Sequence, residues 1–119
     1  MNEQINEIEW IQNWYLSQCD GDWEHSFAIT ITNLDNPGWQ ISIPLSETEL
    51  ELRFFDPIDL RRSEQDWVRC WTAMGWEIGG EQLGIPPRVQ YFQALCGPQN
   101  LIESLKIFRQ WATSRAVNS

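Results

Sequence analysis

The densest group of polar side chains is a run that ends in the only histidine of the chain, Cys19-Asp20-Gly21-Asp22-Trp23-Glu24-His25. Carboxylates at alternate positions suit hard divalent cations, which bind several oxygen ligands. A calcium loop also needs a glycine at its sixth position and a glutamate at its twelfth, and both are missing here. We interpret the run as a turn whose carboxylates cap backbone groups or contact a partner, and we expect no metal and no cofactor. A metal-dependent hydrolase at Asp20, Asp22, Glu24 and His25 is an alternative that requires bound metal.

Three cysteines, Cys19, Cys70 and Cys96, raise the possibility of thiol chemistry. A thiol enzyme needs a thiolate stabilised by nearby cations or by the amides of a helix N-terminus. Cys96 precedes a predicted helix, whereas Cys19 lies among acids that disfavour a thiolate. The sequence has no phosphate-binding glycine loop, nucleophile elbow or second histidine, so we assign no catalytic residue. A small thiol-dependent, sulfurtransferase-like enzyme using Cys96 or Cys19 is the alternative function.

The charge is strongly negative and unevenly distributed. The chain has eight basic and 17 acidic residues, for a net charge of −9. Residues 1–60 carry twelve acids against Arg53 alone, a net −11, whereas residues 61–119 sum to +2. Nucleic acids and anionic membranes repel such a chain, so we exclude both as partners and expect a cationic one.

Glu47, Glu49 and Glu51 alternate along a predicted strand and would form a carboxylate row on one face. Such a row is either a solvated face that protects a sheet edge or a contact for a basic partner. The chain also holds eight tryptophans. We expect most of them in the core, with Trp23 and Trp39, nearest the acidic loops, as candidate interface anchors.

The elements that must position these residues follow from hydrophobic periodicity. Asn6 and Glu9 have capping-box spacing and predict a helix over residues 6–18. Period-two patterns predict strands at Phe27–Thr32, Trp39–Leu45, Leu50–Phe54, Ile58–Arg62, Trp67–Met74 and Val89–Cys96. Asn36-Pro37-Gly38 predicts a turn, and Pro44 an edge or a strand end.

Residues 75–88, rich in glycine and proline, indicate a long excursion, and Gly97-Pro98 opens a second helix with proline at its first position. The short connections require antiparallel pairing. We therefore predict one α+β domain over residues 1–119. It consists of an antiparallel meander of about five or six strands packed with an N-terminal and a C-terminal helix.

No signal peptide is readable at the acidic N-terminus, and no apolar run approaches the ~18 residues that span a bilayer. An odd number of cysteines disfavours a disulfide framework. We expect a cytoplasmic protein with reduced thiols, existing as a monomer or a weak homodimer.

A set of motifs extends over most of the chain: Trp10–Gln18 running into Cys19–His25, Leu34–Trp39, Ser63-Glu64, Asp66-Trp67, Cys70 and Gly97–Leu101 with the helix to Trp111. Through these motifs the chain resembles the immunity protein 53 family of bacterial polymorphic toxin systems. Residues 76–88 form a longer stretch than the family pattern. Some members have carried the label "rhodanese-related sulfurtransferase", but this chain lacks the βαβ alternation and basic thiol loop of that chemistry.

The resemblance implies a cytoplasmic inhibitor that binds a cognate toxin and blocks its active site or its access to substrate. The acidic charge fits a basic toxin independently of the resemblance. We therefore predict that the partner-binding residues are Asp20, Asp22, Trp23, Glu24, Asp35, Trp39, Glu47, Glu49 and Glu51.

Overall fold

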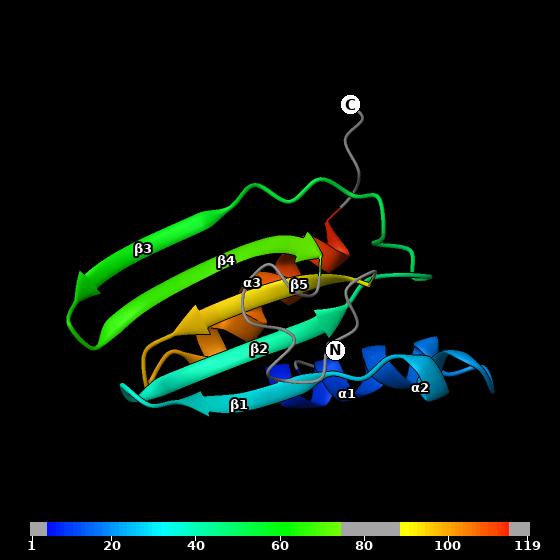
Figure 1. Cartoon of the computed structure of the whole chain (residues 1–119), viewed down its shortest axis with the longest axis horizontal. Helices are drawn as coiled ribbons and strands as arrows, with labels where there is room; N and C mark the ends of the chain where they lie inside the picture. The colour runs from blue at the N-terminus through cyan, green and yellow to red at the C-terminus, as the bar shows by residue number, and fades with distance from the viewer. Residues whose placement is uncertain (1–4, 75–88, 115–119) are drawn as a thin grey trace.

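The computed structural model describes residues 5–74 and 89–114. Its elements are α1 (Glu7–Gln18), α2 (Trp23–Ser26), β1 (Thr30–Leu34), β2 (Gly38–Pro44), β3 (Ile58–Ser63), β4 (Asp66–Met74), β5 (Gln90–Cys96) and α3 (Leu101–Thr113). The strands form one five-stranded antiparallel sheet, and α1 and α3 pack together on one of its faces (Figure 1). The predicted α+β class, with an antiparallel sheet and two terminal helices, is confirmed.

The core lies between the sheet and these two helices. Ile41 and Ile43 of β2 and Phe92 of β5 are fully buried. Phe108 of α3 packs edge-on against Trp14 of α1, with ring centroids 5.3 Å apart, and lies 5.1 Å from Phe92. Each such side chain contributes about 1.5–3 kcal/mol through its burial. This aromatic packing therefore fixes the position of α1 relative to the sheet.

The order of the strands corrects the predicted meander. The sheet runs β1-β2-β5-β4-β3, so the last strand in the sequence lies between β2 and β4. The consecutive residues 91–94 of β5 are all buried, which suits a strand covered on both faces. β3 is mostly exposed and lies at an edge, where Asp59, Arg61 and Arg62 disfavour pairing with another chain.

The predicted strand at Leu50–Phe54 is wrong. Residues 46–57, here called the 46–57 loop, begin as successive turns. The amides of Thr48, Glu51 and Arg53 donate to the carbonyls three residues earlier, at 3.1, 3.2 and 3.2 Å. These local bonds replace a sheet ladder, so Glu47, Glu49 and Glu51 do not form a row on a strand face.

Two other boundaries differ from prediction. Residues 23–26 form the unpredicted short helix α2, so β1 begins at Thr30 instead of Phe27. Pro98 lies in a turn before α3, whose N-cap is Asn100, instead of at the first helical position. Gly97 in that turn is required by packing, because a Cβ there would collide with the carbonyl of Gln65.

The remaining elements agree with prediction. The amide of Glu9 donates to Asn6 Oδ1 at 2.7 Å and caps α1, and Pro44 ends β2. β3, β4, β5 and the turn at residues 35–37 lie where expected, to within a few residues at their ends. The predicted excursion at 75–88 lies outside the described residues. Among the described residues, no helix is long and apolar enough to cross a membrane.

Candidate functional site

The structure separates the predicted partner-binding residues into two groups at opposite ends of the sheet. One group lies where α1 ends and β2 leaves the sheet, and we call it the acidic end; it comprises Asp20, Asp22, Glu24, Glu47, Glu49 and Glu51. Asp35 and Trp39 lie at the other end, at the β1–β2 turn. In Figure 1, α2 and the loop after β2 lie at the right of the view, and the β1–β2 turn lies at the left.

Hydrogen bonds join the two segments of the acidic end, which are distant in sequence. The indole Nε1 of Trp23 donates to the carbonyl of Ser46 at 3.1 Å. From α1, Trp14 Nε1 and Gln18 Nε2 donate to the two carboxylate oxygens of Glu49 at 3.1 and 3.3 Å. The acidic end is therefore a defined surface held by side chains from the core and from α1.

Within the turn at residues 19–25, two carboxylates serve the backbone. Asp20 Oδ1 accepts the amides of Trp23 and Asp22, both at 2.9 Å, and these bonds lower the pKa of Asp20. The Glu24 carboxylate accepts the amides of Asp20 and Gly21 at 3.0 and 2.9 Å. Its own backbone amide, followed by those two, lowers the pKa of Glu24. Asp20 and Glu24 thus shape the turn, whereas the exposed Asp22 makes no side-chain cap bond.

Trp23 is a core residue. Its side chain is 3% exposed and packs against Trp14 and Phe27, with ring centroids 6.3 and 5.4 Å away. The ring therefore supports the acidic end from the protein core and is not accessible to a partner. Trp39 is half-buried, and its Nε1 donates to the carbonyl of Pro98 at 3.0 Å.

The 46–57 loop places further carboxylates on the surface. Glu47 and Glu49 are exposed, and Glu47 has a φ of 63°, a left-handed conformation that costs a non-glycine residue about 1–2 kcal/mol. The Glu47 amide donates to Glu51 Oε1 at 3.1 Å. Arg53 directs its guanidinium to the end of α3, where Nη1 bonds the carbonyls of Trp111 and Ser114 at 3.0 and 3.1 Å. This cation therefore complements a helix C-terminus instead of neutralising the loop.

The ion pairs of the described residues lie elsewhere. Arg62 pairs with Asp66 and Glu103 at 2.9 and 2.6 Å, and Arg109 pairs with Glu7 at 3.1 Å. No carboxylate of the acidic end forms an ion pair within residues 5–74 and 89–114. The two segments that supply these carboxylates, residues 19–25 and 46–51, contain six acids and neither lysine nor arginine, so they concentrate negative charge at this end.

The thiols are not arranged for catalysis. Cys70 and Cys96 are fully buried; burial raises the pKa of Cys70 to about 12 and also raises the pKa of Cys96. The half-buried Cys19 thiol donates to the carbonyl of Tyr15 at 3.4 Å. A reactive thiol needs the opposite change in pKa. Among the described residues, no group of three or more His, Cys, Asp or Glu side chains is placed to hold a metal ion.

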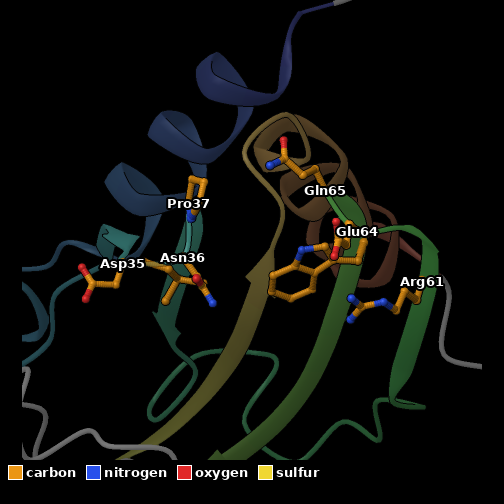
Figure 2. A pocket seen from close by; sticks show the side chains of 8 residues that line it. Asp35, Asn36, Pro37, Arg61, Glu64 and Gln65 are labelled. Atoms are coloured by element: carbon orange, nitrogen blue, oxygen red, sulfur yellow. The ribbon is translucent and has the colours of Figure 1, made fainter.

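A cavity of about 760 Å³ lies at the opposite end, between the tips of the β1–β2 and β3–β4 hairpins. Figure 2 shows Asp35, Asn36 and Pro37 on one side and Arg61, Glu64 and Gln65 on the other, with the Asp35 carboxylate pointing away from Arg61. The lining contains neither histidine nor cysteine. It therefore offers no thiol and no imidazole, and its two carboxylates, Asp35 and Glu64, lie on opposite sides of it.

Two exposed side chains were missed by the sequence analysis. Leu52 and Phe54 of the 46–57 loop are 94% and 79% exposed, although their alternation with charged residues predicted a buried strand face. The turn-forming Ser46-Glu47-Thr48 just before them is the signal that argues against a strand. These apolar side chains border the acidic end, since Glu51 lies between Leu50 and Leu52.

Comparison with known proteins identifies the family of the chain. No curated protein and no solved structure is detectably similar to this chain. A family model described as Immunity protein 53 matches residues 8–113, a span that includes all of α1 except Glu7, the acidic end and α3. The chain therefore belongs to the immunity protein 53 family.

Proposed function

We propose that this chain neutralises a basic bacterial toxin domain by binding it through the acidic end. Membership of an immunity protein family implies a cognate toxin as the partner. The observation that supports this surface is the Trp23–Ser46 hydrogen bond, which joins the two acidic segments, together with the Trp14–Glu49 bond, which holds the second segment to α1. We expect the protein to act in the cytoplasm, as a monomer or a weak homodimer.

The members of the acidic end have different roles in this proposal. Asp22 and Glu47 are exposed and contact the partner, whereas the exposed Glu49 also holds the loop to α1 through its bonds with Trp14 and Gln18. Asp20, Trp23 and Glu24 hold the turn that presents them. Asp35 and Trp39, at the opposite sheet end, lie outside the proposed contact surface.

Electrostatics supplies the mechanism of capture. A concentrated negative field steers a basic protein and raises the rate of association by about 10–1,000-fold at low ionic strength. Many antibacterial toxins act on nucleic acids and need a basic substrate groove, which an acidic inhibitor complements and covers. The chain then inhibits by occupying that groove, with no chemical step of its own.

The thiol-enzyme alternative receives no support from the site. Both strand cysteines are buried, and burial raises the pKa of each thiol. An inhibitor needs only a complementary surface, which the acidic end provides.

The test requires the cognate toxin domain, which is sought among the proteins encoded by neighbouring genes and is produced with and without the chain in a bacterial host. The wild-type chain should restore growth and form a complex with the purified toxin domain. Its association rate should fall steeply between about 50 and 500 mM salt, because a shorter Debye length screens the steering field.

The decisive variant combines Asp22→Lys and Glu47→Lys, and a matched control combines Asp35→Lys and Glu64→Lys at exposed sites elsewhere; Glu49 is left unchanged because its carboxylate holds the loop to α1. Both variants change the net charge equally. The first should slow association at least ~10-fold and the control much less. Equal effects of the two variants would refute the acidic end as the contact surface, and failure of the wild-type chain to bind would refute the inhibitor function.

A further inference from the structure

The 46–57 loop projects two apolar side chains beside the acidic end. Leu52 is 94% exposed and Phe54 is 79% exposed. We propose that Leu52 and Phe54 are apolar anchor residues that bind the surface of a basic protein partner. This inference depends on the proposed function and extends it by naming residues that fix the bound complex.

The loop is held on both sides of each exposed side chain. Leu50 is fully buried and Phe55 is 6% exposed, so both residues fasten the loop to the core. The carbonyl of Phe54 accepts the indole N–H of Trp111 at 2.9 Å, and Arg53 bonds the end of α3. The outward positions of Leu52 and Phe54 are therefore set before binding, which lowers the entropic cost of association.

The surface beside these side chains is hollowed. A shallow cavity of about 480 Å³ lies between the loop and strands β4 and β5, with Leu52, Phe54, Thr72 and Gln90 in its lining. A projecting aromatic ring next to a hollow allows two surfaces to interlock, as at the centres of protein interfaces. Single exposed apolar residues are common, but two fixed on one loop beside a hollow indicate a contact.

The charges near Leu52 and Phe54 favour a basic partner. Glu47, Glu49, Glu51 and Asp56 flank Leu52 and Phe54 in the sequence, while the Arg53 guanidinium is directed to α3. An apolar centre with an acidic rim is complementary to an apolar pocket rimmed by lysine and arginine. A second copy of this chain fits poorly, because a two-fold interface would bring the same acidic rims together.

The experiment measures binding kinetics between the full-length chain and the cognate toxin domain. The test variant carries Leu52→Ser and Phe54→Ser, and the control carries Leu60→Ser and Ile102→Ser, which are 42% and 46% exposed in the wild type. The test variant should dissociate at least ~10-fold faster with a nearly unchanged association rate, since anchors act mainly on dissociation. The control should behave like the wild type, and Phe54→Trp should keep the slow dissociation.

The outcomes separate this inference from the proposed function. If the wild-type chain does not bind the toxin domain, the proposed function fails. If it binds and the test variant dissociates at the wild-type rate, only the anchor assignment is overturned. A wild-type dimer that the test variant converts to a monomer, measured by light scattering, would overturn it in favour of self-association. Unchanged thermal unfolding of both variants shows that they are folded, as expected for exposed positions.

Discussion

The indole nitrogen of Trp23 lies 3.1 Å from the carbonyl oxygen of Ser46, and this hydrogen bond joins the turn after α1 to the loop after β2. The Trp23 ring is buried among Trp14, Tyr15 and Phe27. A core side chain therefore determines the relative position of two acidic surface segments. In this protein, the packing that stabilises the fold also arranges the candidate site.

Replacing Trp23 should reduce both stability and toxin binding. Trp23→Ala removes a buried aromatic ring and should lower the free energy of unfolding by about 3–5 kcal/mol. Trp23→Phe keeps most of the ring but leaves the Ser46 carbonyl without its indole donor, for a loss of about 1–3 kcal/mol. Urea unfolding measures both changes; Trp39→Phe, which removes the Trp39–Pro98 hydrogen bond at the opposite end, should lower stability without slowing association with the toxin domain. A loss below about 0.5 kcal/mol for Trp23→Ala would contradict the packing described here.

The turn at residues 19–25 should make stability depend on pH in the acid range. Backbone amides lower the folded-state pKa values of Asp20 and Glu24 below their ordinary values of 3.8 and 4.5. The unfolded chain therefore binds more protons in this window, and stability rises with pH through it. The contribution is complete above the ordinary values and is lost as pH falls through the lowered ones.

The combined change Asp20→Asn and Glu24→Gln should flatten this dependence. Free energies of unfolding measured between about pH 2.5 and pH 6 should show a smaller slope for the variant than for the wild type. Asp59→Asn, on the exposed edge strand β3, provides the control. Parallel curves for the wild type and the double variant would show that the turn does not carry the effect.

The left-handed backbone conformation at Glu47 should lower the free energy of unfolding, and substitution by glycine should restore part of it. Its φ of 63° costs a non-glycine residue about 1–2 kcal/mol, whereas glycine loses about 0.5–1 kcal/mol more chain entropy on folding. Glu47→Gly should therefore raise the free energy of unfolding by about 0.5–1 kcal/mol, while slowing association with the toxin domain. Glu49→Gly, at a position without positive φ, should not stabilise the chain. A destabilising Glu47→Gly would rule out the proposed strain.

Much of the fold could be predicted from the sequence because its signals are local. Asn6 and Glu9 indicate the start of α1, and the hydrogen bond between them forms as expected. Asn36-Pro37 indicates the β1–β2 turn. By contrast, the central position of β5 depends on pairing between strands distant in sequence, with Ile43 opposite Phe92, and no local pattern specifies such a partner.

The 46–57 loop shows why periodicity alone fails. Leu50, Leu52 and Phe54 alternate as in a strand, yet only Leu50 is buried. The loop is determined by its local turn hydrogen bonds together with distant contacts, such as Trp111 Nε1 to the Phe54 carbonyl. The acidic residues of the site were evident from charge, but their assembly was not, because it depends on the Trp23–Ser46 bond.

The strand cysteines should react slowly with alkylating agents. Burial raises the pKa of Cys70 to about 12 and also raises the pKa of Cys96, so neither forms a thiolate readily at neutral pH. In the native protein both should remain unmodified by iodoacetamide under conditions that modify the half-buried Cys19, and both should react after unfolding in urea. Mass spectrometry of proteolytic fragments measures each site. Rapid modification of Cys96 in the folded protein would instead support the thiol-enzyme alternative.

Hydrogen exchange of the chain, alone and in complex with the cognate toxin domain, tests the central claim most directly. If the acidic end is the contact surface, amide exchange should slow at residues 19–25 and 46–57 and remain unchanged at the hairpin tips, residues 34–37 and 63–66. Slowed exchange at the hairpin tips, with none at residues 19–25 or 46–57, would contradict it.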